Sequence, residues 1–198
     1  MTSIRGVVIP DETVRQLMQG NKSAQGEVYT VLAPHVYSMA LRVLRDPQGA
    51  EDITQDTFID VITKAHTIKS PSKFVGWVRT IAVNRCYMRL RSPWYKRRLD
   101  VELEDEVIEE DHTIGLDLER ILESLDQKTR MVLWLYCVEG YTHEEIGKLM
   151  KRSTSYSKII ISRLTKRLNK TESNDDTEAS TSTLQSKITD QWRVSLCP

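Results

Sequence analysis

Cysteine pairs, long apolar runs and an export signal are all missing from this sequence. Its three cysteines, Cys86, Cys137 and Cys197, are far apart and form no CxxC pair or Cys/His cluster, which argues against a disulfide framework or a zinc site. No apolar run approaches about 18 residues, so no membrane-spanning helix is expected. The first residues have no apolar segment typical of a signal peptide. We therefore expect a protein of the reducing cytoplasm without a membrane partner.

Sequence signatures of enzymes are also missing. The stretch HEEIG at residues 143–147 lacks the second histidine of a zinc-protease motif, and there is no glycine-rich phosphate loop. No serine or cysteine lies in a nucleophile motif. We expect no catalytic residue, no metal site and no cofactor, and hence a protein that is not an enzyme.

Glycine and proline are scarce, at 8 and 6 of 198 residues, and apolar residues recur at helical spacing. This pattern predicts an all-α fold of two small helical domains, with helices at 11–18, 24–44, about 47–66 and about 73–92, and further helices over 116–170. Two helices are expected to bury one face each, consisting of Val28, Tyr29, Leu32, Val36, Met39, Val43, and of Ile53, Phe58, Val61, Ile62, Ala65. The predicted organisation is a domain at 8–95, an acidic flexible linker at 96–114, a domain at 115–170 and a polar, disordered tail at 171–198.

Charge is segregated along the chain, although its formal sum is zero. Residues 61–99 contain ten lysines and arginines and no acid, whereas residues 100–111 are crowded with acids. A solvated face usually mixes both signs, so a stretch without acids suggests a polyanionic partner. Aromatic residues such as Trp77 lie among these cations, and aromatic rings beside cations suit single-stranded nucleic acid. For Trp77 itself, packing in the core is an equally good interpretation.

The second domain has the order of elements of a helix-turn-helix. Thr142 and Glu145 form a capping box that starts one helix, Gly140 suits the end of the preceding one, and a basic helix follows. In this motif the start of the second helix faces bases, while later cations contact phosphates. A plain helical hairpin with a solvated basic face is the alternative.

Several segments, in this order, resemble the extracytoplasmic-function sigma factors of bacterial RNA polymerase. GAEDITQDTF resembles the signature of the family's region 2, and FVGWVRTIAVNRCYMRLR resembles its Phe-x-x-Trp-Leu-x-x-Ile-Ala-x-Asn segment. LDQKTRMVLWLYCVEGYTHEEIGKLM resembles the start of region 4, where Glu-Glu-Ile-Ala is usual, and SRLTKRL resembles the end of its recognition helix. The likeness runs from about residue 11 to residue 169.

This resemblance implies a transcription initiation factor that binds the clamp helices and flap of core RNA polymerase. It also implies that region 4 binds the −35 element as duplex DNA, and that region 2 binds the melted −10 strand. The polymerase contacts would be Asp52, Gln55, Asp56 and Asp60. The −10 contacts would be Lys69, Lys73, Phe74, Trp77, Asn84 and Arg85. The −35 contacts would be Ser155, Ser157, Lys158, Arg163 and Lys166. The alternatives are a helix-turn-helix regulator that acts without being a polymerase subunit, and a protein-interaction adaptor.

One departure from the family concerns the acidic stripe that is expected to face polymerase. Asp52, Asp56 and Asp60 follow one another at four-residue spacing, but Thr63 and Lys64 stand where relatives often continue with an acid. Phosphorylation of Thr63 would add about −1.5 to −2 charges. We hypothesise that this modification activates the protein; an ordinary surface threonine is the alternative. The controlling partner would be either a Ser/Thr protein kinase or an anti-sigma factor.

Overall fold

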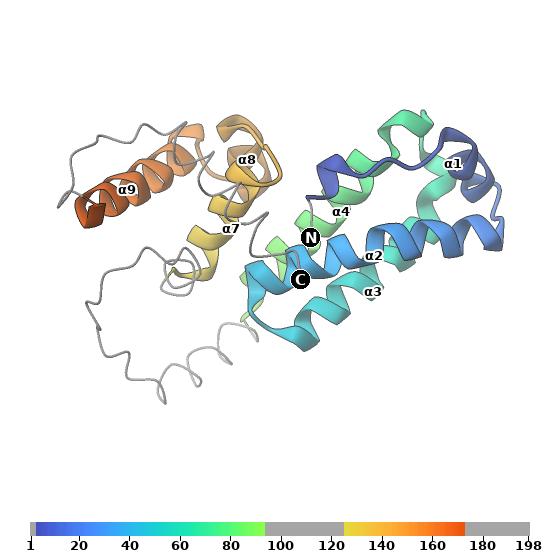
Figure 1. The fold of residues 1–198 in the computed structure, drawn as a ribbon, viewed down its shortest axis with the longest axis horizontal. Helices are drawn as coiled ribbons and strands as arrows, with labels where there is room; N and C mark the ends of the chain where they lie inside the picture. The colour runs from blue at the N-terminus through green and yellow to red at the C-terminus, as the bar shows by residue number, and fades with distance from the viewer. Residues whose placement is uncertain (1–2, 94–124, 173–198) are drawn as a thin grey trace. The chain divides into compact units, whose positions relative to one another are not determined.

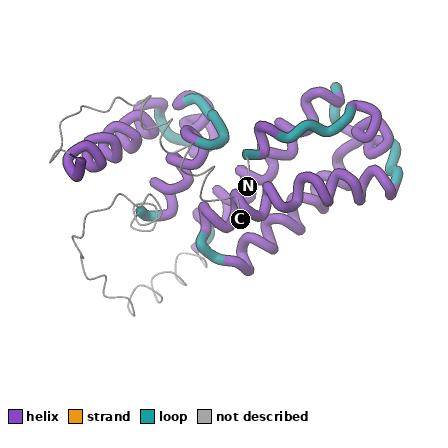
Figure 2. The backbone as a smooth tube through the Cα atoms, in the orientation of Figure 1, coloured by secondary structure: helices purple, strands orange, loops and turns teal. Residues whose placement is uncertain are grey.

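The structure, a computed structural model, describes residues 3–93 and 125–172 (Figure 1). The chain divides into two compact units, Met1–Met88 and Arg89–Pro198. The described residues form helices joined by loops and contain no strand (Figure 2), which confirms the predicted all-α fold. The predicted linker and nearly all of the predicted tail lie outside the described residues.

The first unit consists of four helices and three short 3-10 turns. The helices are α1 (Asp11–Met18), α2 (Lys22–Leu44), α3 (Pro47–Lys64) and α4 (Phe74–Arg91), and the turns are η1 (Ile4–Gly6), η2 (Ala65–Thr67) and η3 (Pro71–Lys73). Local sequence explains where they begin. The side chain of Asn21 accepts hydrogen bonds from the amides of Ser23 and Ala24 at the start of α2. Pro47 occupies the first turn of α3, where its missing N–H costs nothing.

The long helices α2 and α3 lie side by side and form most of the first unit (Figure 1). The chain reverses between them at Arg45, which ends α2 in the left-handed conformation with a φ of 54°. Apolar side chains of α2, α3 and α4 are buried together, including Val28, Leu32, Val36, Met39, Phe58, Val61, Phe74 and Val78.

Two residues that were expected to be buried in this core are instead exposed. Tyr29 is 48% exposed and Ile62 is 45% exposed. Tyr29 lies at the margin of the core, where its ring meets Phe58 edge-on with a centroid distance of 4.8 Å. The predicted buried faces of α2 and α3 were therefore too wide by one residue each.

The second unit contains α7 (Gln127–Cys137), α8 (His143–Met150) and α9 (Thr154–Glu172). Both signals predicted between α7 and α8 are present: Gly140 has a φ of 68°, and Thr142 and Glu145 form a reciprocal capping box. The three helices contact one another, and apolar residues such as Met131, Leu135 and Ile146 are fully buried. The helix predicted from residue 116 lies outside the described residues.

The turn between α8 and α9 folds tightly against α8 at Gly147. A Cβ atom at this glycine would stand 3.0 Å from the carbonyl oxygen of Arg152 and 3.2 Å from the amide of Thr154. Both neighbours are backbone, so neither moves easily out of the way. Gly147 stands where the Glu-Glu-Ile-Ala pattern of region 4 has alanine. Because it has no Cβ atom, it allows the turn to approach α8 unusually closely.

Candidate functional site

The outer face of α3 combines acids with exposed aliphatic side chains. Asp52, Gln55 and Asp56 are exposed, and on the same helix Ile59 is 58% exposed and Ile62 45%. Residues at three- and four-residue spacing share one face of a helix. This face of α3 therefore presents both acidic and aliphatic side chains to solvent.

Asp60 does not lie freely on that face, because it is held by two cations. Arg85 of α4 donates from Nε to the Asp60 carboxylate over 2.9 Å and from Nη2 to the same oxygen. Its Nη1 donates to Asp56 over 2.7 Å, and Lys64 Nζ donates to the second oxygen of Asp60. The hydrogen bond from Lys64, followed by that from Arg85, lowers the pKa of Asp60, while partial burial opposes this shift. We call these four residues the α3–α4 ion cluster.

The ion cluster joins residues that the sequence had assigned to two different partners. Asp56 and Asp60 were expected to contact polymerase, and Arg85 was expected to contact −10 DNA. The side chain of Asp60 is only 16% exposed and that of Arg85 28%, against 54% for Asp56. The cluster therefore holds Asp60 and part of Asp56 away from a partner.

Thr63 lies on the same line of α3 as Asp52 and Asp56. It follows them by eleven and seven residues, which are close to whole numbers of helical turns, whereas Asp60 is rotated away from that line. Thr63 is exposed, and its hydroxyl donates to the carbonyl of Ile59 over 2.7 Å. The side chain therefore occupies the accessible face of α3.

The outer side of α4 and the loop before it contain most of the residues predicted to bind −10 DNA. Lys69, Lys73 and Asn84 are exposed, and Trp77 is partly exposed. Phe74 is different: it is 0% exposed, with its ring 6.2 Å from that of Trp77. The prediction that Phe74 contacts −10 DNA needs correction, because this first residue of α4 points into the core.

Two residues on the outer side of α4 were not predicted as part of a binding surface. Thr80 and Met88 are exposed, Met88 to 71%, and they are four residues before and after Asn84. Helical spacing from Asn84 was the signal that could have identified them. In the loop before α4, the hydroxyls of Ser70 and Ser72 lie 2.9 Å apart on the surface.

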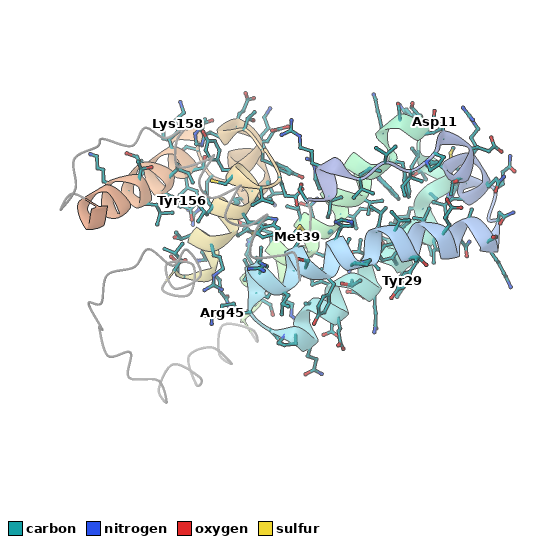
Figure 3. All side chains as sticks on the ribbon, in the orientation of Figure 1. Asp11, Tyr29, Met39, Arg45, Tyr156 and Lys158 are labelled. Carbon is teal, nitrogen blue, oxygen red and sulfur yellow. The ribbon has the colours of Figure 1, made fainter. Side chains whose placement is uncertain are left out.

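The second unit presents a polar and basic stripe along α9. Ser155, Lys158, Arg163 and Lys166 were all predicted to contact DNA, and all are exposed. Figure 3 shows Lys158 and Tyr156 in the first turns of α9. The Arg152 guanidinium lies 5.9 Å from the centre of the Tyr156 ring, close enough for a cation–π contact.

Ile159 and Ser162 complete the α9 stripe and were not among the predicted residues. Ile159 is 48% exposed, and Ser162 is exposed beside Arg163. They follow Ser155 by four and seven residues, so helical spacing alone would have included them.

Ser157, which was predicted to contact DNA, faces the inside of the domain. It is 0% exposed, and its hydroxyl lies 3.0 Å from Nδ1 of His143. The His143 ring stacks on Tyr136 with a centroid distance of 4.5 Å. Burial lowers the pKa of His143, and the charge of Lys158 lowers it further. Ser157 therefore links α9 to α8 and is not available to DNA.

Other kinds of site find little support in the part of the chain that the structure describes. No group of three or more His, Cys, Asp or Glu residues there could hold a metal ion. None of the described helices combines the length and apolar character needed to cross a membrane. Burial raises the pKa of Cys137 to about 12, so this thiol stays protonated and unreactive at neutral pH.

Comparison with known proteins gives the two units a family. Residues 28–95 match the model of Sigma-70 region 2, and residues 115–168 match that of Sigma-70 region 4. The extracytoplasmic-function (ECF) RNA polymerase sigma factor SigE of Mycolicibacterium smegmatis is 32% identical to this chain over the matched residues. The match covers 64% of this chain and 54% of the length of SigE. The ECF sigma factor SigW of Bacillus subtilis is 25% identical over 69% of this chain and 82% of its own length.

A solved structure with a similar fold is that of the sigma factor RpoE in complex with the anti-sigma factor NepR from Bartonella quintana. It covers 76% of this chain and 98% of its own, with a TM-score of 0.50 and 24% identity.

Two sigma regions in their usual order, on separate helical units, define the class of this protein: the chain belongs to the sigma-70 family. Its relatives SigE and SigW further identify it as a sigma factor of the extracytoplasmic-function type. This family also makes a helix-turn-helix regulator without a polymerase partner the less favoured interpretation.

Proposed function

We propose that this sigma factor joins core RNA polymerase and directs initiation at its own class of promoter. The observation that carries the proposal is the order of the two sigma regions on two helical units. The outer face of α3 would bind polymerase through Asp52, Gln55 and Asp56, helped by Ile59 and Ile62. The mixture of acids and exposed aliphatic side chains on this face supports that assignment.

For the −10 element, the proposed contacts are the outer side of α4 and the loop before it. Lys69 and Lys73 would hold phosphates, Asn84 would contact bases or sugar, and the partly exposed ring of Trp77 would stack on an unpaired base. Arg85 belongs to this group only after it leaves its two carboxylates. Phe74 is omitted, because its ring is buried.

For the −35 element, the proposed contacts lie on the α9 stripe. Ser155 and Lys158, near the start of the helix, would approach base edges in the major groove. Arg163 and Lys166, farther along, would contact phosphates, which supply affinity with little sequence preference. Ser157 is omitted for the reason given above.

Phosphorylation of Thr63 is the proposed activating event. Two features of the structure support it: the side chain is exposed, and it lies on the same line of α3 as Asp52 and Asp56. The family resemblance also implies that the acidic stripe often continues near this position. A phosphate there would carry about −1.5 to −2 charges at neutral pH. A Ser/Thr kinase is thus the proposed controlling partner. An anti-sigma factor, like the one bound to RpoE in the related structure, is the competing possibility.

Transcription with sigma-free core polymerase on a mapped promoter tests both the sigma function and its activation by phosphorylation of Thr63. Wild-type protein treated with kinase and Thr63→Glu should support initiation, while Thr63→Ala should give little product. Thr67→Ala is the matched control, because Thr67 is also an exposed threonine, one helical turn beyond Thr63, and should behave as wild type. Full activity of Thr63→Ala would remove the phosphorylation hypothesis, and no initiation by any variant would remove the sigma function.

A further inference from the structure

The α3–α4 ion cluster cancels most of the charge on the acidic face of the first unit. Asp52, Asp56 and Asp60 supply three negative charges, and Arg85 and Lys64 bring two positive charges into direct contact with two of those acids. In the folded protein these two cations offset the negative charge of Asp56 and Asp60.

The two cations hold the carboxylates in different ways. The Arg85 fork spans Asp56 and Asp60 from another helix, and charge-assisted pairs of this kind are among the stronger hydrogen bonds in proteins. Lys64 reaches Asp60 from within α3 with a side chain that is 59% exposed. A basic partner that docks on this face must displace these cations or bind beside them, and both reduce its affinity.

We infer that Arg85 and Lys64 form an intramolecular cationic screen that weakens docking of polymerase on the unmodified protein. This inference rests on the proposed function, in which the outer face of α3 binds polymerase. The screen would also give one phosphate on Thr63 a way to activate the protein. A phosphate on Thr63 adds about −1.5 to −2 charges, which is close to the two charges that Arg85 and Lys64 offset.

The phosphate would act on the same two cations. Thr63 is next to Lys64 in the chain and three residues beyond Asp60. A phosphate on Thr63 would therefore compete with Asp60 for the Lys64 ammonium. If the Arg85 side chain changes rotamer, the phosphate would also compete with Asp60 for its guanidinium. Any cation that moves to the phosphate releases a carboxylate to the surface. If the ion cluster served only to hold α4 against α3, removing its cations would not change the affinity for polymerase. The affinity therefore distinguishes a cationic screen from a purely structural cluster.

The test removes the screen without supplying a phosphate. Affinity of the full chain for core polymerase is measured in the Thr63→Ala background, with and without Lys64→Gln. We expect about two- to fivefold tighter binding at low salt, with the gain shrinking as salt rises. Arg85→Gln in the same background should tighten binding on the order of tenfold, because it releases Asp56 and removes one of the two cations from Asp60. Lys22→Gln, which removes an exposed lysine at the start of α2, is the matched control.

The outcomes separate the screen from the function on which it rests. Lys64→Gln removes an exposed side chain and leaves the Arg85 fork in place, so it keeps the test valid if Arg85→Gln proves to unfold the unit. Unchanged or weaker binding by Lys64→Gln overturns the screen. If unmodified wild type transcribes as well as Thr63→Glu while Lys64→Gln still binds more tightly, phosphorylation is wrong and the screen stands. If no variant binds core polymerase, both fail.

Discussion

The two units hold their functional charges in opposite ways. In the first unit, Arg85 is paired across helices with Asp56 and Asp60. In the second unit, Lys158, Arg163 and Lys166 are exposed on one helix, and within the described ranges none of the three makes an ion pair. A partner that docks on the ion cluster must therefore exchange contacts that already exist, whereas a ligand of α9 meets cations that make no ion pair with the described residues.

This difference has energetic consequences. When one ion pair is exchanged for another, the binding free energy gains only the difference between the two interactions. Small changes at the ion cluster are therefore enough to control binding. Free cations on α9 release counterions from DNA, which gives affinity that is broad and strongly dependent on salt. The first unit is thus the better place for regulation, and the second is the better place for constant DNA affinity.

The largest expected effect separates the packing role of one aromatic residue from the binding role of its neighbour. Phe74→Ala removes a fully buried ring and should cost the first unit about 3–5 kcal/mol of stability. Trp77→Ala, which removes a partly exposed ring, should cost less stability and weaken binding to single-stranded −10 DNA in the holoenzyme. Hydrogen exchange measured by mass spectrometry reports the stability of each unit separately. Equal stability losses for the two variants would contradict the assignment.

A smaller effect tests whether the cations of α9 are free to bind DNA. Replacing both Arg163 and Lys166 with alanine should weaken holoenzyme binding to duplex −35 DNA and make the slope of log affinity against log salt shallower by about two units. Lys128→Ala, an exposed lysine at the start of α7, is the control and should keep the slope of wild type. An unchanged slope in the double variant would place the DNA elsewhere.

The pH dependence of stability should also differ between the units. The pKa of His143 is lowered on folding, so the folded state favours the neutral ring. The contribution of His143 to the free energy of unfolding is therefore fully present above the unfolded pKa of about 6.5. It is lost as pH falls below that value. The lowered pKa of Asp60 keeps its contribution intact until pH falls below about 3.9. Between pH 6.5 and pH 5, the second unit should therefore lose more protection from hydrogen exchange than the first.

His143→Gln provides the control for that pH effect. The variant should be less stable than wild type at pH 7, because it loses the stacking on Tyr136, but its stability should no longer fall over this range. A second unit that loses protection equally in wild type and His143→Gln would exclude His143 as the cause.

The smallest expected effect concerns the turn of the helix-turn-helix. Lys151 ends α8 in the left-handed conformation with a φ of 50°, which glycine adopts more readily. Lys151→Gly should therefore stabilise the second unit by up to about 1 kcal/mol, as measured by its thermal midpoint. Lys148→Gly, in the regular part of α8, should destabilise it by about 1 kcal/mol. Destabilisation by both would contradict the role of the turn geometry.

Local patterns in the sequence were sufficient for the helices and their order. The proline of α3, the capping box of α8 and the glycine after α7 act within a few residues, so they could be recognised without a fold. The start of α2 was misplaced by two residues, because the capping role of Asn21 was not recognised. The exposed cations of α9 were also predictable, since one helical stripe is set by spacing alone.

The sequence by itself determined that the chain makes helical units with acidic, basic and aromatic surfaces, because composition and period act locally. Only the tertiary structure decided which of those residues are available. Phe74 and Ser157 looked like surface residues until packing buried them, and Asp60 looked like a free acid until Arg85, 25 residues away in the chain, paired with it. Burial and pairing depend on which helices meet, and no local pattern specifies those meetings.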